Sequence, residues 1–177
     1  IWRHILCAAL NKKRFIFRQN EVAEELHVSV STVFNALKVP RKSGAVEVTG
    51  RFFRLRDAEK LLLIWATARK LAAETLYKTH VDMPARRIEG MVPPDIVFGA
   101  FSAYRLSHGE PPADYDTVYV YSVNLPEIQK RFPPHKGVPN FFVLKSDPLL
   151  SSFGQMTPDP QTFVDLWNIP AWYAKDY

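Results

Sequence analysis

The stretch VAEELHVSVSTVFNAL, residues 22–37, decides the fold of the first third of the chain. It contains two short helical patterns separated by His27, Val28 and Ser29. The first places Val22, Ala23 and Leu26 on its apolar side. In the second, Ser29 is a plausible N-cap, and four apolar residues follow at the spacing i, i+3, i+4, i+7 that predicts a core-facing helix stripe. These four residues are Val30, Val33, Phe34 and Leu37.

The opposite face of the second helix is polar. It carries Ser31, Thr32, Asn35 and Lys38. Short polar side chains and a cation are the residue types that reach base edges and phosphates when a helix lies in a major groove. An ordinary solvated helix surface is the alternative interpretation.

The flanking segments add a helix, a strand and a hairpin. An amphipathic helix from Trp2 precedes the strand pattern RFIFR, residues 14–18, and Asn20 can cap the next helix. After Pro40, the sequence RKSGAVEVTGRFFRLRD at 41–57 alternates apolar and polar residues about a turn at Thr49-Gly50, which predicts a β-hairpin. Its tip and open face carry three cations, Arg51, Arg54 and Arg56.

This order of elements resembles the winged helix-turn-helix regulators of bacteria and archaea over residues 2–57. His27 departs from the pattern, which usually has glycine in the turn. The resemblance implies a domain that binds double-stranded DNA, and a protein-protein module is the alternative. The residues expected in or beside the major groove are Ser29, Ser31, Thr32, Asn35 and Lys38. Those expected on phosphates or in the minor groove are Arg41, Lys42, Arg51, Arg54 and Arg56.

The charge distribution favours a polyanion-binding first domain. The net charge is +5, but residues 1–57 hold eleven Lys and Arg against five Asp and Glu, and residues 58–177 hold twelve against thirteen.

The single cysteine excludes an internal disulfide, and the apolar run LLLIWATA, residues 61–68, is too short to span a bilayer. We therefore expect a cytoplasmic protein with no membrane partner. Because the chain starts at Ile1 without a methionine, we expect its true N-terminus to be missing. A targeting segment that has been removed from the chain is an open alternative.

The predicted fold class is α+β, with a winged helix-turn-helix at residues 1–57, a connecting helix at 58–71 and a small mixed α/β domain at 72–177. Asp57 can cap the connecting helix, which is apolar around much of its circumference. A homodimer matched to palindromic sites would cover this helix, and a spine inside a monomer is the alternative.

The second domain resembles the C-terminal domain of AbiEi-type antitoxins of type IV toxin-antitoxin pairs. The likeness is carried by FSAYRLSHG at 101–109 and PDPQTFVDLWNIPAWYA at 158–174. It implies a regulator that represses its own operon and whose C-terminal domain opposes a nucleotidyltransferase-like toxin. A solitary regulator whose second domain binds an effector is the alternative.

No catalytic, metal or cofactor site is predicted. The five histidines are scattered singly, and no phosphate-binding glycine motif occurs. A metal-dependent nucleotidyltransferase is the one enzyme alternative. Its carboxylate pair would be Asp114 and Asp116, downstream of Gly99 and Ser102.

Overall fold

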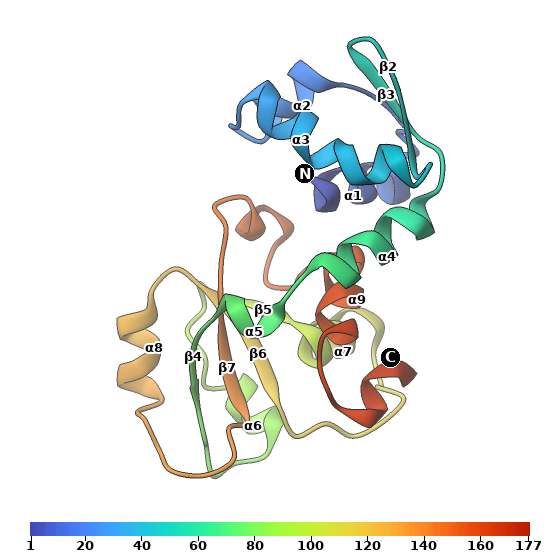
Figure 1. The fold of residues 1–177 in the computed structure, drawn as a ribbon. Helices are drawn as coiled ribbons and strands as arrows, with labels where there is room; N and C mark the ends of the chain where they lie inside the picture. Colours follow the sequence, from blue (N-terminus) through green and yellow to red (C-terminus); the bar gives the residue numbers. More distant parts are fainter. The chain divides into compact units, whose positions relative to one another are not determined.

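A computed structural model describes residues 1–177 and divides them into two compact units, Ile1–Arg69 and Lys70–Tyr177. Each unit combines helices with its own sheet, so the predicted α+β class is confirmed (Figure 1). No helix has the length and apolar character needed to cross a membrane.

The first unit consists of helices packed on one face of a three-stranded antiparallel sheet of order β1-β3-β2. Its elements, in chain order, are α1 (Trp2–Lys12), β1 (Ile16–Arg18), α2 (Gln19–Glu25), α3 (Val30–Lys42), β2 (Val46–Thr49), β3 (Phe52–Leu55) and α4 (Ala58–Ala68). The rings of Phe17 in β1 and Phe53 in β3 stack at 5.1 Å beneath the helices. Leu61 of α4 is fully buried in the same core, which makes α4 part of this unit.

Two local predictions in this unit are wrong, the start of α2 by two residues and the hairpin turn by one. Helix α2 begins at Gln19, and Arg18 rather than Asn20 occupies its N-cap position. The buried Gln19 holds this start in place, because its backbone N–H donates to the carbonyl of Arg51 at 3.1 Å. The hairpin turn lies at Gly50-Arg51 rather than Thr49-Gly50, and Gly50 takes the positive φ of 59° that a tight turn requires.

The second unit is built on a mixed four-stranded sheet of order β4-β7-β6-β5, in which only β6 and β7 are parallel. Its strands are β4 (Thr75–Thr79), β5 (Val97–Gly99), β6 (Val118–Ser122) and β7 (Phe141–Lys145). Its helices are α5 (Leu71–Glu74), α6 (Ala85–Glu89), α7 (Ala100–His108), α8 (Leu125–Arg131), α9 (Asp159–Trp167) and the 3-10 turns η1 (Leu150–Phe153) and η2 (Trp172–Asp176).

Both faces of this sheet are buried. Val118 and Val120 of β6 pack on one side with residues of α6 and α8, while Tyr119 and Tyr121 pack on the other with residues of α7 and α9. This alternation follows from the two-residue period of a strand.

Candidate nucleic-acid interface

Helix α3 starts as predicted from the sequence. Ser29 has extended backbone angles, and its Oγ accepts a hydrogen bond from the backbone N–H of Thr32 at 3.1 Å. The two hydroxyl groups also lie 2.8 Å apart. Ser29 is therefore the N-cap, and both side chains are exposed.

The buried stripe of α3 differs from the predicted one. Val33, Leu37 and Pro40 are buried, at the spacing i, i+4, i+7. The prediction that Val30 and Phe34 face the core is wrong, because each is 48% exposed. The helix is therefore rotated about its axis from the expected orientation, and Pro40 rather than Val30 extends the buried stripe.

Pro40 explains how α3 continues past a residue that normally ends a helix. A proline has no N–H to donate to the carbonyl four residues earlier, here that of Ala36. The indole Nε1 of Trp2 in α1 donates to this carbonyl instead, at 2.8 Å. The helix therefore extends to Lys42 and places Arg41 and Lys42 in its last turn.

The polar stripe of α3 is exposed along its whole length. Ser31, Asn35, Lys38 and Lys42 follow one another at i, i+4, i+7 and i+11, opposite the buried stripe. Thr32, also exposed, lies beside them. All side chains that the sequence analysis placed on the outer face of α3 are thus accessible together.

A groove of about 620 Å³ lies between α3 and the hairpin turn. Two arginines from distant parts of the sequence, Arg41 and Arg51, line it together. The remaining lining residues are Gln19, Asn20, Val30, Phe34, Val48 and Gly50. No carboxylate lines this groove, so its electrostatic character is cationic.

Arg51 is held at this groove by α2. The side-chain amide of Gln19 donates to the carbonyl of Gly50 at 3.4 Å, and the backbone N–H of Gln19 donates to that of Arg51. The hairpin turn is therefore attached to the start of α2 at two consecutive residues. This attachment positions Arg51 beside the exposed face of α3.

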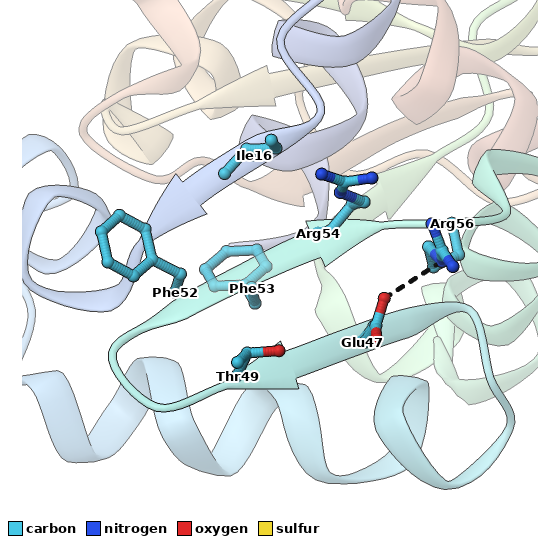
Figure 2. Close-up of a pocket in the computed structure, with 7 residues that line it drawn as sticks. All are labelled: Ile16, Glu47, Thr49, Phe52, Phe53, Arg54 and Arg56. Carbon is cyan, nitrogen blue, oxygen red and sulfur yellow. Dashed lines mark ion pairs between the residues drawn. The ribbon is translucent and has the colours of Figure 1, made fainter.

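Arg54 and Arg56 lie on a different surface. Phe53 and Leu55 of β3 point into the core, so Arg54 points to the outer face of the sheet, away from the helices. Figure 2 shows both arginines there with Ile16, Phe52 and Glu47, around a groove of about 400 Å³. Arg56 Nε forms an ion pair with Glu47 at 3.2 Å. The structure therefore does not bring Arg54 and Arg56 together with the residues of α3.

The carboxylates of α2 are largely engaged within the unit. Arg14 pairs with Glu21 at 3.2 Å and with Glu25 at 3.1 Å. His4 lies 2.9 Å from Glu25, and its burial lowers its pKa although Glu25 acts in the opposite direction. These pairs reduce the repulsion that the two glutamates would exert on a nearby phosphate backbone.

The carboxylates of the enzyme alternative lie in a loop of the second unit. Asp114 and Asp116 are both exposed, and Asp116 accepts a hydrogen bond from the hydroxyl of Tyr173 at 3.1 Å. Ser102 is fully buried in α7, and its Oγ has no hydrogen-bond partner. No group of three or more His, Cys, Asp or Glu side chains is placed to hold a metal ion.

Sequence reasoning missed two polar networks in the second unit. Glu89 accepts hydrogen bonds from Arg105 at 2.5 Å and from Tyr115 at 2.6 Å, and burial together with Glu89 raises the pKa of Tyr115 to about 12. The fully buried Asp165 accepts from the hydroxyl of Tyr121 at 2.7 Å and from the backbone N–H of Ala100 at 3.3 Å. An acidic residue inside the apolar pattern of TFVDLW was the available signal for Asp165.

The Asp165 network joins the two segments that carry the antitoxin resemblance. Asp165 belongs to residues 158–174, and Ala100 directly precedes residues 101–109. His108 Nε2 also lies 3.1 Å from Asp159 Oδ1. Helices α7 and α9 are therefore connected at both of their ends.

Comparison with known proteins finds no matching family model, no matching curated protein and no matching solved structure.

Proposed function

We propose that the unit Ile1–Arg69 binds double-stranded DNA as a winged helix-turn-helix and that the chain is a transcriptional regulator. The main support is the exposed face of α3, where a polar stripe ending in Lys42 adjoins a groove lined by Arg41 and Arg51 and by no carboxylate. The element order α1, β1, α2, α3, β2, β3 and the sheet order β1-β3-β2 support the same proposal.

The residues of this face have different roles in the proposal. Asn35 reads a base edge, because an amide side chain can pair with adenine in the major groove. Lys38, Lys42, Arg41 and Arg51 neutralise phosphates, which gives affinity without sequence preference. Arg54 and Arg56 take no part in the proposed interface, because they occupy the outer face of the sheet.

For the second unit, we propose a partner-binding role. If the chain is an antitoxin, the partner is a toxin. If the chain is a solitary regulator, the partner is an effector. Large exposed aromatic residues support a protein partner. Trp167 at the end of α9 and Trp172 at the start of η2 are both exposed, and Phe163 lies one helical turn before Trp167 with the two rings 5.8 Å apart. Exposed apolar groups of this size are typical of interaction surfaces.

The test compares three single variants of the full chain on a duplex selected from a random pool and on an unrelated duplex, across a salt series. Asn35→Ala should weaken binding to the selected duplex by ~1 to 3 kcal/mol and hardly change binding to the unrelated one. Arg51→Ala should weaken binding to both and lower the log-log salt slope by about one.

The matched control is Arg54→Ala, which removes the same side chain from the outer face of the same hairpin. It should leave both affinities and the salt slope close to those of the unaltered protein. If Arg54→Ala and Arg51→Ala weakened binding equally, or if the protein bound neither duplex, the proposed interface would be wrong.

A further inference from the structure

Helix α3 exposes two large apolar side chains that its packing does not use. Val33, Leu37 and Pro40 already supply the buried stripe, while Val30 and Phe34 are each 48% exposed. The two residues are four apart and therefore neighbours on one side of the helix. Together they form an apolar strip directly beside the polar stripe that contains Asn35.

The surroundings of this strip indicate what it binds. Val30 and Phe34 line the groove that also contains Arg41 and Arg51, and Lys38 Nζ lies 5.6 Å from the centre of the Phe34 ring. The groove therefore combines arginine side chains with apolar side chains, and no carboxylate lines it. Charge complementarity therefore favours an occupant with both negative charge and an accessible apolar group.

Duplex DNA containing thymine meets both conditions. Its phosphates supply the negative charge, and the C5-methyl group of thymine is the one apolar group that a base pair presents in the major groove. An acidic protein surface with a projecting apolar side chain is the competing occupant, but it would not explain the adjoining polar stripe of Ser31 and Asn35. The adjacent polar and apolar side chains of α3 match the mixed chemistry of a base-pair edge.

We propose that Val30 and Phe34 read thymine methyl groups, so that the preferred duplex contains thymine on the side of α3 that faces the hairpin turn. This inference rests on the proposed DNA binding of the first unit and adds the class of base that it prefers. Phe34 is then a specificity-determining residue that acts by apolar contact rather than by a hydrogen bond.

The experiment removes single methyl groups from the DNA. A duplex selected from a random pool by the full chain is remade with deoxyuridine in place of each thymidine in turn, which keeps the Watson-Crick pair and deletes only the methyl group. At one or two positions, we expect affinity to fall about fourfold per buried methyl group. In Phe34→Ala, the thymidine and deoxyuridine duplexes should bind equally at the position that Phe34 contacts, and Val30→Ala should do the same at a neighbouring position.

The matched control is Phe52→Ala, because Phe52 is 43% exposed in the same unit but lies on the outer face of the sheet. This variant should keep the full discrimination between thymidine and deoxyuridine. Two results would overturn the inference alone: a selected duplex without thymine, or a methyl effect that persists in both Phe34→Ala and Val30→Ala. If the chain selected no duplex at all, the proposed function itself would be wrong, and this inference with it.

Discussion

We expect the stability of the second unit to depend strongly on the hydroxyl group of Tyr121. It donates a hydrogen bond of 2.7 Å to Asp165, whose side chain is fully buried at the junction of α7 and α9. Tyr121→Phe deletes this hydroxyl group and keeps the ring that fills the core. The carboxylate of Asp165 then loses a donor that water cannot easily replace.

The expected cost follows from the burial of the acceptor. Leaving a buried acceptor short of a donor costs ~1 to 3 kcal/mol, and the complete burial of Asp165 puts the loss at the upper part of that range. We therefore expect Tyr121→Phe to lower the free energy of unfolding of the second unit by about 2 to 3 kcal/mol. For a unit of this size, each kcal/mol corresponds to a fall in Tm of roughly 4 °C.

Tyr119→Phe is the matched control. Tyr119 is on the same strand two residues earlier and is also buried, and its ring stacks on that of Phe142 at 4.6 Å. Thermal and urea unfolding of the full chain, followed by amide hydrogen exchange in α7 and β6, would assign the change to the second unit. Equal destabilisation by the two variants, or a loss below about 0.5 kcal/mol in Tyr121→Phe, would refute the role of the Asp165 network.

Three further predictions concern stability. Val33→Ala should cost about 2 kcal/mol in urea unfolding, because it removes two fully buried methyl groups, whereas the exposed Val39→Ala should change stability by less than about 0.5 kcal/mol. His27→Gly should stabilise the first unit by roughly 1 kcal/mol, because His27 has a left-handed φ of 52° that glycine adopts without strain, and a measured loss would contradict this. Tyr115 has its pKa raised to about 12 in the folded state, so the stability that depends on its proton should be present below pH 10 and lost as pH rises from 10 towards 12. Tyr115→Phe should lower stability at pH 7 through loss of the bond to Glu89 but flatten this alkaline decline, which unfolding curves across that range would measure.

Local signals in the sequence predicted the helix starts well. Ser29 and Asp57 each accept a hydrogen bond from the backbone N–H three residues on. Each of these bonds lies within four consecutive residues, so its formation depends little on the rest of the fold. The failure at Asn20 has the opposite cause, since the start of α2 is fixed by hydrogen bonds from Gln19 to the hairpin turn 31 and 32 residues later.

The orientation of α3 could not be predicted from its own pattern. Val33 and Leu37 belong to two apolar stripes at once, one completed by Val30 and Phe34 and the other by Ala36 and Pro40. The hydrophobic period identifies an apolar side but not which of two overlapping stripes is buried. Packing against the rest of the first unit selects the second stripe. The sequence therefore predicted the polar residues of the candidate site but misassigned Val30 and Phe34, the residues on which its base preference is now proposed to depend.

The charge pattern of the first unit, like the orientation of α3, could be interpreted only with the structure. The excess of positive charge before residue 58 predicted a polyanion partner but did not locate the surface that would meet it. On the outer face of the sheet, Arg56 is paired with Glu47 at 3.2 Å, and Arg18 lies 3.7 Å from Glu21. In the groove beside α3, no carboxylate accompanies Arg41 and Arg51. A cation already paired with a carboxylate gains less from a phosphate, because it must give up or share that partner. For this reason, the proposed DNA interface lies at the face of α3 rather than on the outer face of the sheet.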